Sequence, residues 1–202
     1  MRKYFVIALL CASSIAAWPS NGHGQNAAPT VEVFFGGSKL WEHATGGPYH
    51  NNGRELAVTG NFNRFLGLEM DLSEFGSSAA VAPAPAYGDY SRLLFGPHFA
   101  YNANSHVSPF SHVLAGLTHG RQYCGGPDDL LNCNIGNWER GRNAFTAAVG
   151  GGLDVKVFRF FWVRPIQADY VHVFFSNAGE NNLQLSFGFT FRFGSRGKTR
   201  KD

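Results

Sequence analysis

Apolar and polar residues alternate without interruption near the end of the chain. From Leu183 to Phe193 every second residue is leucine or phenylalanine, and the residues between them are polar or glycine. Side chains on a β-strand switch face at every residue, so this pattern predicts a strand with one continuous apolar face. A tilted strand of roughly 9–11 residues is long enough to cross a bilayer. We therefore expect a lipid-facing strand of a transmembrane barrel, with an edge strand of a soluble sandwich as the alternative.

Seven further segments alternate in a similar way. They are Thr30–Ser38, Glu55–Phe62, Phe65–Leu72, Leu93–Tyr101, Phe110–His119, Phe145–Val155 and Trp162–Phe174. Eight is the smallest strand number of bacterial single-chain barrels, and closure of the sheet satisfies every backbone polar group in lipid. The pattern therefore predicts an all-β protein, a transmembrane antiparallel up-and-down β-barrel of eight strands.

The connections between these segments alternate in length. The long ones are Lys39–Asn52, Glu74–Ser91, Gly120–Asn143 and Phe175–Asn182. The short ones are Asn63–Arg64, Asn102–Pro109 and Lys156–Phe161. Outer-membrane barrels have long external loops and short periplasmic turns, so we expect both ends of the barrel chain on the periplasmic side.

Aromatic residues gather near the two predicted rims, where amphipathic rings favour the headgroup level. Those expected at the outer rim are Trp41, Tyr49, Tyr90, Trp138 and Tyr170. Those expected at the inner rim are Phe62, Phe65, Tyr101, Phe110, Phe160 and Trp162.

The first residues have the pattern of a signal peptide. Arg2 and Lys3 supply positive charge, Tyr4–Ala12 is a short apolar run, and small residues follow. We expect a signal peptide over residues 1–24, with cleavage after 16 as the alternative, a short lead at 25–29, the barrel at 30–193 and a basic tail at 194–202. Export by this signal predicts the bacterial outer membrane as the location. The formal net charge is +3, of which Arg2 and Lys3 contribute two units, so nothing indicates a nucleic-acid partner.

Charged residues of the predicted strands fall mainly on the inward face. The lumen of an eight-stranded barrel is only wide enough to be filled by side chains, so charges there must be paired. The expected lumen network consists of Glu32, Glu69, Asp71, His98, His112, Asp154, Gln167, Asp169 and Arg192. Arg192 is the one basic residue that the alternation places well inside this set. Its first expected partner is Glu32, on the adjoining first strand, and its second is Asp154.

Two cysteines remain once the signal peptide is removed. Cys124 and Cys133 both lie in the longest predicted external loop, with eight residues between them. An exported pair so close in sequence favours a disulfide within the loop over two free thiols.

Three segments carry a resemblance to a known family: AVGGGLDV at Ala148–Val155, RPIQADY at Arg164–Tyr170, and the alternating strand Leu183–Phe193. Together they resemble the OmpA-type outer-membrane β-barrel family, over the chain from about Thr30 to Phe193. Members usually end on an aromatic residue that the barrel-assembly machinery recognises.

The resemblance implies that Phe193, with Phe189 and Phe191 before it, forms the insertion signal, although nine residues follow Phe193 here. It also implies outer-membrane lipid and lipopolysaccharide as surroundings. We expect a monomer.

The sequence favours a structural and surface-interaction protein whose external loops contact an unidentified ligand. A narrow porin-like diffusion channel is the alternative. A lipid A deacylase or acyltransferase is less favoured, because neither His106 with Ser108 nor His172 with Ser176 has an identified third residue to orient the imidazole. We expect no cofactor and no metal site, since the eight histidines are scattered without ligand spacing.

Overall fold

The computed structural model describes residues 29–44, 47–81, 84–101, 106–124, 142–174 and 179–195. Its strands are β1 (Pro29–Ala44), β2 (Gly47–Asn61), β3 (Leu66–Val81), β4 (Ala84–Ala100), β5 (Val107–Cys124), β6 (Arg142–Lys156), β7 (Phe161–Phe174) and β8 (Gly179–Ser195). The expected signal peptide and most of the basic tail lie outside the described residues. No helix among the described residues is long and apolar enough to cross a membrane.

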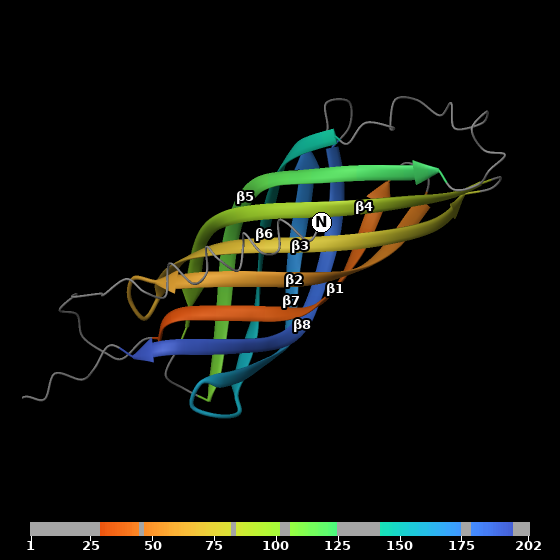
Figure 1. The fold of residues 1–202 in the computed structure, drawn as a ribbon. Coiled ribbons are helices and arrows are strands. Elements are labelled where there is room, and N and C mark those ends of the chain that lie inside the picture. The colour runs from red at the N-terminus through yellow and green to blue at the C-terminus, as the bar shows by residue number, and fades with distance from the viewer. Residues whose placement is uncertain are drawn as a thin grey trace, which may run out of the picture.

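The eight strands form a closed antiparallel barrel in sequence order (Figure 1). Each strand pairs with the next, and β1 pairs with β8 from Pro29 opposite Ser195 to His43 opposite Asn181. Closure leaves no sheet edge, which is the condition for a sheet to exist in hydrocarbon. The prediction of an eight-stranded up-and-down barrel is confirmed.

Two of the predicted external loops are wrong. Most of Lys39–Asn52 belongs to β1 and β2, and most of Glu74–Ser91 belongs to β3 and β4, so only residues 45–46 and 82–83 remain between the strands of each hairpin. The apolar alternation ends where the outer face no longer meets lipid, but antiparallel hydrogen bonding continues beyond that point. Loss of hydrophobic pattern therefore marks the edge of the apolar belt rather than the end of the strand.

The same extension changes the position of one predicted disulfide partner. Cys124 is the last residue of β5 rather than part of a loop. Cys133 lies outside the described residues, so the disulfide stays a prediction.

The opposite end of the barrel has short connections, as predicted for the periplasmic side. Residues 62–65 join β2 to β3, and residues 157–160 join β6 to β7. In the first of these turns the side-chain oxygen of Asn63 accepts hydrogen bonds from the backbone N–H groups of Phe65, at 2.8 Å, and Leu66, at 2.9 Å. Asparagine stabilises tight turns in this way.

The outer wall of the barrel carries an apolar belt. About half the surface of many large hydrophobic side chains is exposed, and these side chains come from outward positions of every strand except β2. Representative members are Phe35, Phe95, Val113, Val149, Ile166 and Phe189. Soluble monomers rarely expose contiguous apolar patches above a few hundred Å², so a belt of this extent is suited to contact with hydrocarbon.

Two aromatic residues expected at the inner rim lie instead in the lumen. Phe110 and Trp162 are buried, with 5% and 3% of their surfaces exposed. Both occupy inward positions of their strands, where rings fill the narrow interior. Phe110 stacks on His98 at 5.1 Å between ring centroids, and the guanidinium of Arg192 lies 3.9 Å from the centre of the Trp162 ring.

A charge on the apolar belt should destabilise the barrel. Phe189 is 48% exposed on the outward face of β8, so Phe189→Arg places a guanidinium in lipid, at a cost of ~2–4 kcal/mol near the midplane. Phe189→Leu keeps the face apolar and is the matched control. Urea unfolding of protein refolded into lipid vesicles should show a large loss of stability for the arginine variant alone. Equal stability of the two variants would contradict a lipid-facing position for Phe189.

Candidate functional site

Sixteen polar side chains in the lumen form one hydrogen-bond network, beside an apolar cluster that includes Leu94, Leu114 and Val171. The network receives at least one side chain from each of the eight strands, and its members are largely buried. The members are Glu32, Ser38, Glu55, Thr59, Asn61, Glu69, Arg92, His98, His112, Asp154, Arg164, Gln167, Asp169, Gln184, Ser186 and Arg192. Most of the residues expected in the lumen therefore lie in one connected group.

Four charged residues form a cluster at the turn end of the lumen. Arg192 Nε donates to Glu32 Oε2 at 2.8 Å, and Arg192 Nη2 donates to Asp154 Oδ2 at 2.9 Å. Arg164 Nε donates to the other oxygen of Asp154, also at 2.8 Å. Both residues expected to pair with Arg192 thus contact it at the same time, because β8 adjoins β1 and the lumen is narrow enough for Arg192 to reach β6.

The expectation that Arg192 is the one basic residue well inside the lumen is wrong, because Arg92 and Arg164 are also buried there. Arg92 lies one residue before the predicted start of its strand, whose true start is at Ala84. Arg164 precedes a proline, and the register between β7 and β8 shifts between Arg164 and Gln167. This irregularity interrupts the alternation from which the inward face was predicted.

Two aromatic rings and a pair of glycines position Arg164. Its guanidinium lies 4.2 Å from the ring centre of Phe34 and 4.1 Å from that of Phe110. The ring of Phe34 lies over Gly36 and Gly188, a directly opposed pair on β1 and β8, where a Cβ atom would come within 2.5 Å and 3.0 Å of the ring. Because Gly36 and Gly188 have no side chains, the ring of Phe34 can pack closely against the backbone of β1 and β8.

Glutamine and glutamate side chains continue the network into the middle of the barrel. Arg164 Nη1 donates to Gln167 Oε1 at 2.6 Å, and Gln167 Nε2 donates to Glu55 Oε1 at 3.0 Å and to Asp169 Oδ2 at 2.7 Å. The second oxygen of Glu55 accepts from Ser186 at 2.5 Å and from Gln184 at 2.7 Å. Gln184 in turn accepts a hydrogen bond from Arg92.

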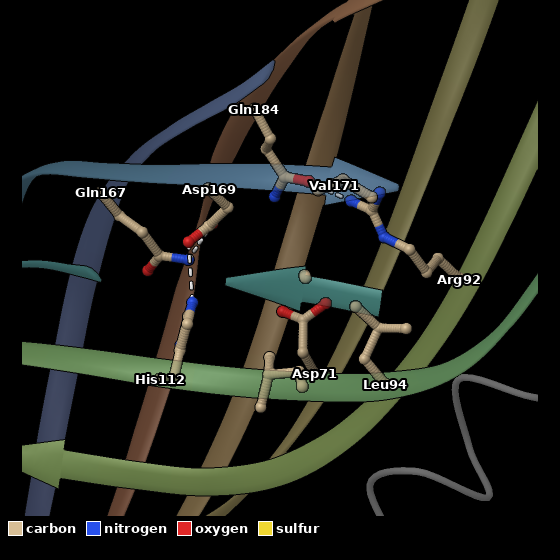
Figure 2. Close-up of a pocket in the computed structure, with 10 residues that line it drawn as sticks. Asp71, Arg92, Leu94, His112, Gln167, Asp169, Val171 and Gln184 are labelled. Atoms are coloured by element: carbon tan, nitrogen blue, oxygen red, sulfur yellow. Dashed lines mark hydrogen bonds and ion pairs between the residues drawn. The ribbon is translucent and has the colours of Figure 1, made fainter. Parts of the chain in front are cut away.

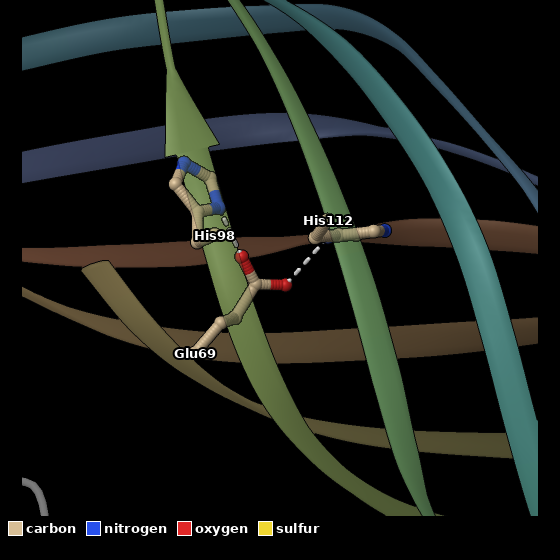
Figure 3. A group of neighbouring side chains, drawn as sticks. All are labelled: Glu69, His98 and His112. Atoms are coloured by element: carbon tan, nitrogen blue, oxygen red, sulfur yellow. Dashed lines mark hydrogen bonds and ion pairs between the residues drawn. The ribbon is translucent and has the colours of Figure 1, made fainter. Parts of the chain in front are cut away.

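Two histidines and two carboxylates form a second buried group. His112 Nδ1 lies 2.9 Å from Glu69 Oε1, and His112 Nε2 lies 2.7 Å from Asp169 Oδ1. His98 Nδ1 lies 2.5 Å from the other oxygen of Glu69 (Figure 3). An imidazole with a carboxylate at each nitrogen donates both hydrogen bonds only as the imidazolium. Glu69, His98 and His112 come from three strands, so their sequence spacing does not reveal their proximity.

The free space in the central part of the described lumen is small. A cavity beside Asp71, Arg92, His112, Asp169 and Gln184 has a free volume of about 10 Å³, which is room for one water molecule (Figure 2). Asp71 accepts a hydrogen bond from Ser73 at 2.5 Å. Side chains therefore fill this part of the lumen.

Of the two serine–histidine pairs considered for lipid hydrolysis, only His106 with Ser108 lies wholly within the described residues, and no hydrogen bond joins these two side chains there. Ser108 is buried and its hydroxyl donates to the backbone oxygen of Tyr101 at 3.3 Å, whereas His106 is exposed. His172 contacts the side chain of Asn181 at 2.7 Å. Ser176 lies outside the described residues.

No protein-family model and no curated protein matches the sequence. Solved structures match it over most of its length. Neisserial surface protein A (NspA) has a TM-score of 0.63 at 13% identity, with 84% of this chain and 100% of that chain aligned. The outer membrane protein OprG from Pseudomonas aeruginosa has a TM-score of 0.58 at 10% identity, with 83% and 97% aligned. Ail of Yersinia pestis, solved with the heparin analogue sucrose octasulfate, has a TM-score of 0.55 at 18% identity, with 81% and 99% aligned.

This chain has the fold of the small outer-membrane β-barrels. The OmpA-type resemblance that the residue patterns indicate is thus confirmed for the fold. The similarity covers 81–84% of this chain, and the other structures are aligned over 97–100% of their lengths. At these identities the comparison establishes the architecture alone.

Removing Arg192 from the turn-end cluster should lower the free energy of unfolding far more than breaking an ion pair on the outer surface does. Arg192→Met leaves the buried carboxylate of Glu32 without a guanidinium partner and leaves Asp154 with Arg164 alone. Removing one member of a buried ion pair costs ~3–5 kcal/mol. The control is Arg54→Met, which removes an arginine 60% exposed from its 2.5 Å contact with Glu74. Exposed pairs are worth ~0–1 kcal/mol.

Urea unfolding of both variants in the same lipid vesicles measures the difference in stability. Similar losses in the two variants would show that the buried cluster does not stabilise the closed barrel.

Proposed function

We propose that this protein is an integral bacterial outer-membrane barrel with a structural and surface-interaction role, exercised through its external end. The observation that carries the proposal is the combination of an apolar belt outside and a lumen filled inside by a polar network with aromatic and aliphatic side chains. Such a barrel is held in lipid by its wall and has no room for a solute within. Its exposed ends are then the surfaces left for recognition.

The external connection between β5 and β6 is the longest and is the proposed contact segment. Residues 125–141 contain three acidic residues, Asp128, Asp129 and Glu139, and one basic residue, Arg140. Ail is solved with a polysulfated sugar analogue, but the acidic excess of this segment does not favour a polyanion here. We infer a ligand that is neutral or cationic at its point of contact.

The end of β8 supports a proposal about assembly. Phe191 and Phe193 stack with ring centroids 6.5 Å apart, and the strand reaches Gly194, whose φ of 71° is the left-handed conformation that glycine favours. We propose that the assembly machinery recognises Phe189, Phe191 and Phe193, with the basic tail beyond them outside the recognised segment. A monomer inserted in this way is surrounded by phospholipid and lipopolysaccharide.

The external position of residues 125–141 can be tested on intact cells. Trypsin should cleave after Arg140 without permeabilisation, while the closed barrel protects the strands from digestion. Arg140→Gln is the matched control and should remove that cleavage. Cleavage at Arg64 or Arg159, in the turns at the other end, under the same conditions would contradict the orientation.

The filled lumen predicts a barrel that does not conduct. Planar-bilayer recordings of the refolded wild type should show no discrete channels, because the turn-end cluster and the glutamine–glutamate contacts occupy the interior. A variant that carries Gln167→Gly and Glu55→Gly removes two central members and is the comparison. Reproducible channels in the wild type would establish the alternative of a narrow diffusion pore.

A further inference from the structure

We propose that Glu69, His98 and His112 form a buried binding site for one divalent transition-metal ion of the zinc type. This site goes beyond the surface role proposed above and depends on neither the external ligand nor the orientation in the membrane. The three side chains bring one carboxylate and two imidazoles together inside the lumen (Figure 3).

The ligand atoms are already close enough to share one ion. A carboxylate oxygen of Glu69 and one nitrogen of each histidine all lie within 4.8 Å of one another. His98 and His112 are direct cross-strand partners on β4 and β5, and Glu69 lies on the adjacent strand β3 opposite Gly96. The barrel register therefore holds the three residues together, without any contribution from a mobile loop.

Contacts behind the ligands hold both imidazoles in a coordinating orientation. His112 presents Nδ1 toward Glu69, while its Nε2 contacts Asp169 at 2.7 Å. Metal-binding histidines commonly donate their second nitrogen to a carboxylate, which fixes the ring and its tautomer. Asp169 is itself held by Gln167, and the ring of His98 is stacked on Phe110 with only 16° between their planes.

The charge of the lumen also favours a bound cation. Among the described residues the buried carboxylates are Glu32, Glu55, Glu69, Asp71, Asp154 and Asp169, and the buried guanidiniums are Arg92, Arg164 and Arg192. Six carboxylates face three guanidiniums, and the guanidinium contacts lie toward Glu32, Asp154, Gln167 and Gln184 rather than toward Glu69. Binding of a divalent ion would displace the proton that His112 Nδ1 donates to Glu69, and it would still leave a net gain of positive charge beside Glu69.

The donor set selects the class of ion. Two imidazole nitrogens and one carboxylate oxygen suit zinc and its neighbours, whereas calcium and magnesium require oxygen ligands. Zinc bonds of ~2.0–2.2 Å in a tetrahedral arrangement separate the ligand atoms by roughly 3.4 Å. The present distances from Glu69 to His98 and His112 are 2.5 Å and 2.9 Å, measured to its two different oxygens, and the three ligand atoms lie within 4.8 Å of one another. Binding of one ion therefore requires side-chain shifts on the order of 1 Å.

Zinc content after refolding tests the site directly. Protein without an affinity tag is refolded into detergent micelles from urea, with EDTA or with equimolar zinc chloride, and free metal is removed before elemental analysis. Zinc is supplied during refolding because the ligands are almost completely buried once the barrel is closed. The test variants are Glu69→Gln, His98→Gln and His112→Gln. The matched controls are His119→Gln and His172→Gln, whose histidines contact asparagine side chains away from the lumen.

We expect one zinc ion per wild-type barrel, the same content in both controls, and at least a tenfold loss in each lumen variant. The migration of unheated samples in gel electrophoresis establishes which variants have folded. No zinc in the wild type overturns the proposal, as does full zinc content in a folded lumen variant or loss of zinc in a control. In that case the group is a purely hydrogen-bonded network.

If none of the lumen variants folds, the visible absorption spectrum of wild-type protein refolded with cobalt(II) tests the proposal. Cobalt(II) held by two imidazoles and a carboxylate should give visible absorption bands of tetrahedral nitrogen–oxygen coordination. A spectrum of hydrated, octahedral cobalt would overturn the proposal.

Discussion

The interior of this barrel is too narrow to keep water around its charged side chains, so each buried charge must be satisfied by another side chain. Arg164 illustrates the constraint. Its guanidinium binds Asp154 and Gln167 and is enclosed by the rings of Phe34 and Phe110. Isolated, any of these polar groups would be costly to bury, whereas together they satisfy one another. The contents of the lumen therefore behave as one unit.

This network also specifies how the strands pair. The apolar belt determines which face of each strand points outward, and a slip of one residue would reverse every face. A slip of two residues would preserve the belt, but it would move Arg192 away from Glu32 and Gln184 away from Glu55. Contacts that join β8 to β1, β2 and β6 thus discriminate between registers that the hydrophobic pattern alone treats as equivalent.

The wall and the lumen of the barrel have different roles. The wall supplies a generic apolar surface, and its aromatic and aliphatic residues are exchangeable as long as the face remains apolar. The lumen is specific, because the separation of its donors and acceptors depends on the identity of each side chain. Glu69, His98 and His112 are held together in this interior, and they are the residues for which we propose a bound metal ion. The recognition surface is then confined to the ends of the barrel.

The sequence by itself determined the strand number, the antiparallel barrel and the outward face, because a lipid-facing wall requires strict alternation that is visible along the chain. It also placed Glu32 and Asp154 beside Arg192, since neighbouring strands and a narrow lumen limit the possible partners. Only the tertiary structure decided that β1 to β4 extend past the apolar belt, where hydrogen bonding needs no hydrophobic pattern. It alone revealed the inward position of Arg164, which a register shift conceals, and the histidine group, whose members are distant in sequence and joined by barrel closure and register.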